Sequence, residues 1–340
     1  MDGAARRWFD SRTFDAAQFR AADLIRAKQQ SGHTVSVVIP ARNEAATVAA
    51  VVGQIRQALM VTGLVDELIV LDSDSTDDTA AVARAAGAAV FAARTVDTGT
   101  AASPGKGEAL WKSLFVSTGD LLVFIDADLT EWGPHFVTGL LGPLLADPGI
   151  LLVKGFYDRL ADDLPEQPDT PTVPAPQGGR VTELVARPLL NLYWPELAAV
   201  VQPLAGEWAV RRSLIESLPI PVGYGVEFAS LTDTWRRHGL PAIAQVDLGR
   251  RGHRHQNVHD LGVMAAEILA AAMRRLPRDV AGVAGEAVQA ARAGLLAAGS
   301  PSLQQYDRDA QGWRSRPVPV LERPPARTNE RYRTAAGCSS

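Results

Sequence analysis

The chain contains 340 residues, of which 46% are apolar and 21% are charged, and its formal net charge is -4. This composition is typical of a globular protein large enough to bury a substantial core, and it lacks the basic excess that nucleic-acid-binding proteins usually carry. The one cysteine, Cys338, excludes an intrachain disulfide, which favours a reducing compartment.

The N-terminus lacks the apolar segment of a signal peptide, and no apolar run is long enough to cross a membrane. We therefore expect a cytoplasmic protein without a membrane span. Residues 1–33 are predicted to form a helical extension, with a helix over residues 14–29.

Residues 34–160 alternate between short apolar runs and helical patterns. Strands are predicted at 35–39, 67–71, 88–92, 121–125 and 150–156, and helices at 45–59, 77–86 and 108–117. This alternation indicates crossover connections between parallel strands. The predicted fold class is therefore α/β, with a mostly parallel sheet and helices on both of its faces.

The rest of the chain is less regular. Residues 161–180 hold five prolines and the pair Gly178-Gly179, which predicts a loop. Residues 181–313 are expected to form a C-terminal α/β extension, with helices at 181–194, 232–238 and 261–276. The tail at 314–340 is rich in proline and arginine, which predicts disorder.

Polar residues follow three of the predicted strands. Asn43 and Glu44 come after the first strand, Ser73 after the second, and Asp126 and Asp128 after the fourth. Open α/β sheets bind ligands at the carboxyl ends of their strands. Two carboxylates two residues apart at such an end suit a hard divalent cation that also binds phosphate. A capping or turn pair of aspartates is the alternative interpretation.

Two longer motifs accompany the aspartate pair. Residues 35–44 read Val-Ser-Val-Val-Ile-Pro-Ala-Arg-Asn-Glu, and residues 67–79 read Glu-Leu-Ile-Val-Leu-Asp-Ser-Asp-Ser-Thr-Asp-Asp-Thr. Together with Asp-Ala-Asp at 126–128, they resemble the nucleotide-binding half of family 2-like glycosyltransferases with the GT-A fold. The resemblance implies that residues 34–160 bind a nucleotide sugar. An acidic turn followed by a helix N-cap is the alternative for the second motif, and both interpretations can hold together.

Four further motifs narrow the resemblance. They read Pro-Gly-Lys-Gly-Glu-Ala-Leu-Trp at 104–111, Gly-Gly-Arg-Val-Thr-Glu-Leu at 178–184, Pro-Val-Gly-Tyr-Gly-Val-Glu at 221–227 and Gly-His-Arg-His at 252–255. From about residue 30 to about residue 275, the chain is similar to the glucosyl-3-phosphoglycerate synthases of actinobacteria. These enzymes transfer glucose from UDP-glucose to 3-phosphoglycerate with retention at the anomeric carbon. The resemblance implies this activity, a homodimer and a requirement for Mg²⁺ or Mn²⁺.

The resemblance also assigns donor-binding residues. The uridine is expected to contact Pro40, Ala41, Asn43, Glu44 and Ser73, and Arg42 is expected to bind the donor. Lys106 is expected to reach the donor diphosphate or the acceptor, and Asp126, beside Ala127, the donor sugar or ribose. The glucose is expected to face Tyr224, Gly225, Val226 and Glu227. The implied catalytic residues are Glu227, Asp126 and Lys106.

The acceptor is expected to contact Gly179, Arg180, Val181, Thr182, Arg251 and His255. Glycine allows close backbone approach, arginine offers a planar fork of donors, and the start of a helix presents free N–H groups to an anion. The implied metal ligands are Asp128 and His253. Without the resemblance, the basic run that contains both histidines suggests a phosphate-binding patch. Lys106 and Arg180 would be surface residues, and Glu227 a structural carboxylate.

Two positions depart from the family pattern. Asp74 stands where glycine is commoner, which bears on the geometry of the acidic turn. His255 stands where asparagine is expected, which bears on its contact with the acceptor.

The mechanism and the exact function stay open at this point. Retention can proceed through a glycosyl-enzyme intermediate on Glu227, or the acceptor hydroxyl can attack from the front face while the leaving phosphate takes its proton. We favour the second route because no second carboxylate is evident as a partner acid. Rival functions are a mannosyl transferase that uses GDP-mannose, a polyprenyl-phosphate sugar transferase and a non-catalytic nucleotide-binding module.

Overall fold

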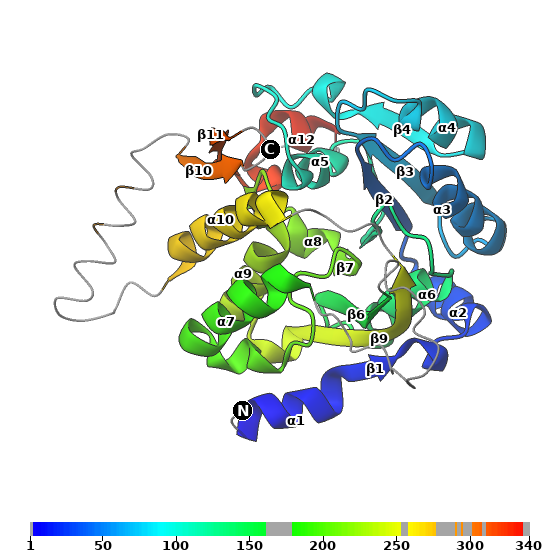
Figure 1. Cartoon of the computed structure of the whole chain (residues 1–340). Coiled ribbons are helices and arrows are strands. Elements are labelled where there is room, and N and C mark those ends of the chain that lie inside the picture. Colours follow the sequence, from blue (N-terminus) through cyan, green and yellow to red (C-terminus); the bar gives the residue numbers. More distant parts are fainter. Residues whose placement is uncertain are drawn as a thin grey trace, which may run out of the picture.

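The computed structural model describes residues 3–160, 179–252, 258–276, 301–307 and 311–335, together with the single positions 290 and 294. Among the predicted site residues, His253 and His255 lie outside the described residues, as does most of the predicted loop at 161–180. Figure 1 shows the arrangement of the helices and strands.

An eight-stranded sheet forms the centre of the protein. Its strands follow the order β1 (Thr13–Asp15), β9 (Ile243–Gly252), β6 (Leu152–Leu160), β7 (Trp208–Arg211), β5 (Leu121–Phe124), β2 (Val35–Ala41), β3 (Glu67–Asp72) and β4 (Ala89–Ala92). Strand β7 is antiparallel to both of its neighbours, and the other neighbouring strands are parallel. The predicted α/β class with a mostly parallel sheet is confirmed.

Helices cover both faces of this sheet. In β2, Val37 belongs to one apolar core and Val38 to the other, since successive side chains of a strand point to opposite faces. The first core is covered by α2 (Ala21–Ser31), α3 (Val48–Ile55), α4 (Thr79–Ala86) and α6 (His135–Ala146). The second is covered by α1 (Gly3–Arg12), α5 (Lys106–Ser113), α7 (Arg187–Tyr193), α8 (Arg212–Ile215), α9 (Val226–His238), α10 (Val258–Arg275) and α12 (Glu330–Ala335).

Several predicted elements have different bounds in the structure. The helix expected over 14–29 is divided into β1, a short 3-10 turn and α2, because Asp15 accepts a hydrogen bond from the Ala17 N–H (2.8 Å) and caps that turn. Strands β1, β7 and β9 and helix α6 are not among the predicted elements. Because β7 and β9 join the central sheet, the segment 181–313 shares its core with residues 34–160.

The tail is the main correction to the predicted organisation. Over its described residues, 314–335, the predicted disordered tail instead forms regular structure: β11 (Gly312–Pro317) pairs with β10 (Ser302–Asp307), β12 (Glu322–Arg323) pairs with β8 (Ile220–Pro221), and α12 follows. Its composition does not reveal distant partners, such as Glu108, which holds Arg323 in a buried ion pair. Figure 1 shows α12, in red, beside α5.

Helix α10 corresponds to the amphipathic segment predicted at 261–276. Ile268 and Ala272 belong to the second core, whereas Arg275 forms a buried ion pair with Asp233 (2.8 Å). Across the described ranges, no helix is both long enough and apolar enough to cross a bilayer.

Candidate active site

A cavity of about 740 Å³ lies at the carboxyl ends of the central parallel strands. Ala41 at the end of β2, Ser73 after β3 and Asp126 after β5 line one part of it, and Tyr224 and Glu267 line another. Ligands of open α/β sheets bind at this edge. Of the strand-end residues predicted from the sequence, Glu44, Ser73, Asp126 and Asp128 therefore meet around one cavity.

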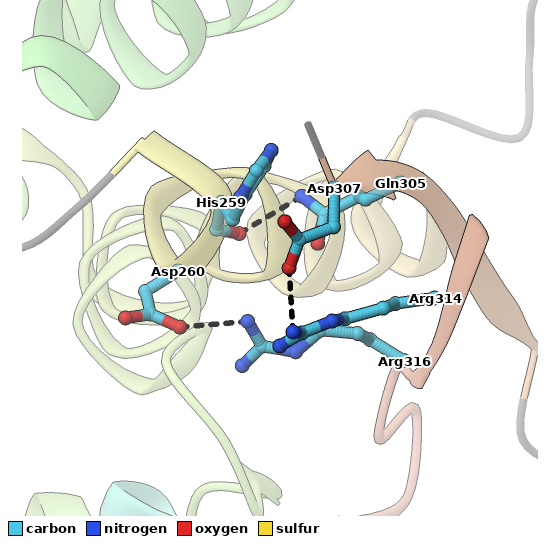
Figure 2. Close-up of a pocket in the computed structure, with 6 residues that line it drawn as sticks. All are labelled: His259, Asp260, Gln305, Asp307, Arg314 and Arg316. Atoms are coloured by element: carbon cyan, nitrogen blue, oxygen red, sulfur yellow. Dashed lines mark hydrogen bonds and ion pairs between the residues drawn. The ribbon is translucent and has the colours of Figure 1, made fainter. Parts of the chain in front are cut away.

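A second cavity, of about 340 Å³, lies between the start of α10 and the β10–β11 hairpin. Figure 2 shows that both of its arginines are paired: Arg316 with Asp260 (2.7 Å) and Arg314 with Asp307 (2.6 Å). Because each cation has an acidic partner, this cavity offers little excess positive charge to a phosphorylated ligand. The first cavity is therefore the candidate active site.

The loops after β2 and β3 form the predicted uridine side of the cavity. Of the donor-binding residues predicted in these loops, the structure places the following along the cavity: Pro40, Ala41, Arg42, Glu44 and Ser73. Asn43 does not line it, because its side-chain oxygen accepts the Thr76 N–H (2.8 Å) and so joins the two loops. Asn43 and Asp74 both have left-handed backbone conformations, with φ of 58° and 59°. The presence of Asp74 where glycine is commoner therefore bears on the geometry of this turn, as expected from the sequence.

The two aspartates after β5 share one arginine. Arg251 Nη2 lies 3.1 Å from Asp126 Oδ2 and 3.1 Å from Asp128 Oδ1. The backbone at Gly206 lies against Asp126, where a Cβ would come within 2.2 Å of Oδ2. Glycine at this position therefore allows the Asp126 carboxylate to sit between the sheet and the cavity.

Lys106 connects the Asp126 carboxylate to Glu227. Its Nζ lies 2.7 Å from Asp126 Oδ1 and 2.9 Å from Glu227 Oε1. Burial lowers the pKa of Lys106, but the charges of Asp126 and Glu227 outweigh this effect and raise the pKa well above its usual value. The structure thus brings together the three residues that the sequence predicts to be catalytic, with a cationic lysine between two carboxylates.

A buried group of side chains that sequence reasoning missed supports Arg251. Its Nη1 donates to the Tyr157 hydroxyl (2.6 Å), which in turn donates to Glu207 Oε2 (2.7 Å). Burial raises the pKa of Glu207, against the lowering effect of the Arg251 charge. Arg251 is predicted to bind the acceptor, but its side chain is only 4% exposed and contacts three carboxylates. In the ligand-free protein, these contacts hold the two aspartates in place.

Lys154 is a second missed cation, in the middle of β6. It is buried and donates a hydrogen bond to the Ala205 carbonyl (2.7 Å), one residue before Gly206. Burial lowers the pKa of Lys154 to about 8. A single lysine within the apolar run 150–156 is a sequence signal that could have drawn attention to this position.

The segment at the start of α9 contributes unequally to the cavity. Tyr224 lines the cavity, and Glu227 is buried and reaches it through Lys106. The Val226 side chain lies in the second apolar core and Gly225 is also buried, and neither residue lines the cavity of the ligand-free protein. Glu267 of α10, a further missed residue, lines the cavity and accepts the Tyr224 N–H at 2.5 Å.

The predicted acceptor segment lies at the start of a π-helical turn, η4 (Thr182–Ala186). Val181 and Thr182 are buried, Gly179 is partly exposed and Arg180 is exposed. None of these four residues lines the cavity of the ligand-free protein. The turn η4 packs against α10, the helix that contains Glu267. The predicted acceptor segment therefore lies next to this helix.

Proteins of known family match most of this chain. The Glycosyl transferase family 2 model matches residues 36–195. Glucosyl-3-phosphoglycerate synthase of Mycobacterium tuberculosis (strain ATCC 25618 / H37Rv) is 47% identical over 298 residues, covering 87% of this chain and 86% of that protein. The chain belongs to the glucosyl-3-phosphoglycerate synthase family. The Petrotoga mobilis protein of the same name is 41% identical over 270 residues, covering 78% of this chain and 81% of that protein.

Solved structures of glucosyl-3-phosphoglycerate synthase from M. tuberculosis share the fold. The complex with Mn²⁺ and UDP-glucose matches with a TM-score of 0.75 and 43% identity, covering 91% of this chain and 95% of that chain. The complex with Mg²⁺ and UDP matches with a TM-score of 0.77 and 42% identity, covering 93% and 98%. The predictions of a GT-A fold and of a glycosyltransferase of this family are confirmed.

The residues of this family member fit a divalent cation at Asp128. The Asp128 carboxylate lines the cavity and is 29% exposed. Arg251 forms an ion pair with its Oδ1 atom. Oxygen ligands of this kind suit Mg²⁺ and Mn²⁺. The described residues contain no group of three or more His, Cys, Asp and Glu side chains arranged for a metal. The other predicted ligand, His253, lies outside them.

Proposed function

We propose that this protein transfers glucose from UDP-glucose to 3-phosphoglycerate with retention at the anomeric carbon, using Mg²⁺ or Mn²⁺. The observation that carries the proposal is the cavity in which Lys106 joins Asp126 to Glu227, in a chain that matches the family over 87% of its length. The M. tuberculosis structures with UDP-glucose and phosphoglyceric acid support the choice of substrates.

The donor occupies the cavity from the uridine side to Tyr224. The loops after β2 and β3 hold the uridine, and the hydrogen bond from Thr76 to Asn43 keeps the two loops in register. Lys106 faces the diphosphate, since a compact ammonium on a glycine-flanked turn suits a phosphate oxygen. Asp126 contacts the sugar or the ribose.

Asp128 and His253 are the residues proposed to hold the divalent cation. When bound, the cation offsets the negative charge that develops on the departing diphosphate. Lys106 adds a fixed positive charge beside the same leaving group. Because Lys106 is already ordered by two carboxylates, little reorganisation is needed when the charge develops.

The position of Glu227 favours front-face attack over a covalent intermediate. Its side chain is 5% exposed, and Oε1 lies 2.9 Å from the Lys106 ammonium. A carboxylate that is buried and paired with a cation is a poor nucleophile, because attack would leave the lysine without its partner. Glu227 therefore keeps Lys106 oriented, while the acceptor hydroxyl attacks and the leaving phosphate takes its proton.

The acceptor binds at the segment that begins with Gly179. Arg180 offers a bidentate fork for the phosphate or carboxylate of 3-phosphoglycerate, and the N–H groups near Thr182 lie at the start of a helical segment. His255 completes the proposed acceptor contacts. Arg180 is exposed in the ligand-free protein, so it is accessible to an incoming anion.

A coupled assay of UDP release tests the proposal. Purified protein should release UDP from UDP-glucose in the presence of Mg²⁺ or Mn²⁺, and the rate should rise when 3-phosphoglycerate is added. The product should carry an α-linked glucose by NMR. A preference for GDP-mannose would support the mannosyl alternative, and binding without turnover of either donor would indicate a non-catalytic module.

We further propose that the protein is a cytoplasmic homodimer. The support is the sequence resemblance, the lack of a candidate membrane-spanning helix in the described part of the chain and the lone Cys338. Light scattering after size-exclusion chromatography tests the oligomer, and a monomer at micromolar concentration would contradict it. Fractionation of the source cells tests the location.

A further inference from the structure

The C-terminal strap, which we define as residues 318–335, packs against the two loops that carry Lys106 and Tyr224. We propose that Arg323 in this strap is a positioning residue for the donor site, an inference that rests on the proposed function. Arg323 does not line the cavity and acts through Glu108 and the loop before Lys106.

The strap first fixes the loop that leads to Tyr224. In the β12–β8 pair, Arg323 lies opposite Ile220 and Glu322 opposite Pro221. The Val222 N–H extends this pairing by donating to the Leu321 carbonyl (3.0 Å). The backbone just before Tyr224 is therefore held by a segment from the far end of the chain.

The same loop is joined directly to the Lys106 turn. The Glu108 N–H donates to the Val222 carbonyl (2.8 Å), and the Gly107 N–H donates to the Gly223 carbonyl (3.2 Å). A Cβ at position 107 would lie 1.8 Å from the Pro221 carbonyl oxygen, so this contact requires glycine. A shift of either loop therefore moves the other.

The Arg323 side chain connects three parts of this arrangement. Its Nε and Nη2 bind the Glu108 carboxylate in a bidentate manner (2.6 and 2.9 Å), and Nη2 also donates to the Ala101 carbonyl (2.6 Å). The guanidinium lies over the Trp111 ring, 5.3 Å from its centroid. Arg323 is 6% exposed and Glu108 is 1% exposed, so water does not compete for these bonds.

These contacts order the wall of the cavity next to Lys106. Glu108 Oε1 also accepts the Ser103 N–H (3.3 Å), and residues 102–105 all line the cavity. Without Arg323, Glu108 would keep Lys112 as a cationic partner (3.4 Å), but the Ala101 carbonyl would lose its donor. The loop 101–105 would then be free to move, and Lys106 with it.

Substitution of Arg323 tests this role in the full-length protein. Arg323→Met keeps an apolar chain on Trp111 and removes all of the polar contacts. It should raise the KM for UDP-glucose about tenfold, and also the Kd for UDP with Mn²⁺ measured by calorimetry. The KM for 3-phosphoglycerate should stay within about twofold of the value for the unaltered protein. Arg323→Lys should give an intermediate value, because one ammonium cannot serve Glu108 as a bidentate partner and Ala101 together.

Two variants within the strap serve as controls. Arg327→Met removes an exposed side chain and should leave both constants unchanged. Tyr332→Phe removes the hydroxyl that donates to Glu216 (2.7 Å), so it should lower Tm without changing UDP affinity. If Tyr332→Phe raises the KM for UDP-glucose and the Kd for UDP as much as Arg323→Met does, the effect is general destabilisation and the inference is overturned.

The remaining outcomes separate this inference from the proposed function. If the unaltered protein neither binds UDP nor uses UDP-glucose, the proposed function fails, and Arg323 loses its role with it. If the unaltered protein is active and Arg323→Met keeps its UDP affinity and its KM, only the positioning role is wrong. Should Arg323→Met not fold, the KM of Arg323→Lys decides: a value equal to that of the unaltered protein overturns the inference.

Discussion

The carboxyl of Glu267 should make the stability of the ligand-free protein fall as the pH rises toward neutrality. The side chain is buried against the Tyr224 loop, where its Oε2 accepts the Tyr224 N–H. Burial raises the pKa of Glu267 to about 7 from the ordinary value of 4.5, and the Tyr224 N–H opposes this rise only in part. Among the described residues, no cation offsets the effect of burial on the pKa of Glu267, whereas Arg251 does so for Glu207.

The sign follows from proton linkage. A carboxyl whose pKa is higher in the folded state binds its proton more tightly there, so its stabilising contribution is complete below pH 4.5 and is lost as the pH rises through 7. A shift of about 2.5 units corresponds to about 3.4 kcal/mol. This is an upper value, because Glu267 lines the cavity and water there screens its charge.

The variant Glu267→Gln removes the charge and keeps an oxygen that can accept the Tyr224 N–H. It should stabilise the protein by up to about 3 kcal/mol at pH 8, and by less than about 1 kcal/mol at pH 5. For a chain of 340 residues, these values correspond to rises in Tm of about 4 °C and about 1 °C.

Thermal unfolding of the ligand-free protein at the two pH values measures the effect. Glu131→Gln is the matched control, since Glu131 is exposed, and it should leave Tm unchanged at both pH values. An equal change in Tm at pH 5 and pH 8 for Glu267→Gln would refute the reasoning. It would mean that this carboxyl does not titrate between these values in the folded protein.

Three further substitutions probe the proposed roles. Asp128→Ala should abolish turnover, by about 10³-fold or more, with Tm preserved; normal activity in the presence of Mn²⁺ would remove the metal assignment. Arg180→Ala should raise the KM for 3-phosphoglycerate about tenfold and spare that for UDP-glucose, and an equal loss for both substrates would argue against an acceptor role. Lys106→Met leaves Asp126 and Glu227 without their shared cation, so it should lower Tm as well as kcat, by about 10²-fold; a variant with unchanged kcat would exclude Lys106 from the chemistry.

The strand-end part of the site is predictable because its signals are local. Ser73 and Asp126 each follow an apolar run, and parallel topology brings the ends of such runs to one edge of the sheet. Lys106 is flanked by glycines, whose close contact with residues 221–223 is the reason for their presence. In these cases a few neighbouring residues are enough to indicate the role.

The supporting charges are not predictable in this way, because their partners are distant in the sequence. Arg251 lies more than one hundred residues from Asp126, and Arg323 more than two hundred from Glu108. Strand β7 is short and antiparallel, so a pattern search for crossover units does not find it, and Glu207, directly before the strand, is missed as well. Composition predicts a disordered tail for the same reason, since it contains no information on what the tail contacts.

The arrangement of charge gives a physical reason why the two aspartates should have different roles. Both oxygens of Asp126 have a cationic partner, Lys106 at Oδ1 and Arg251 at Oδ2. A divalent cation at Asp126 would therefore lie close to two positive charges. Of these two cations, it is Arg251 that also pairs with Asp128. Like charges at such short distances repel strongly in a partly buried site. This difference supports the proposal that the cation binds at the second aspartate, while the first, with its charge already balanced, is suited to accept hydrogen bonds from sugar hydroxyls.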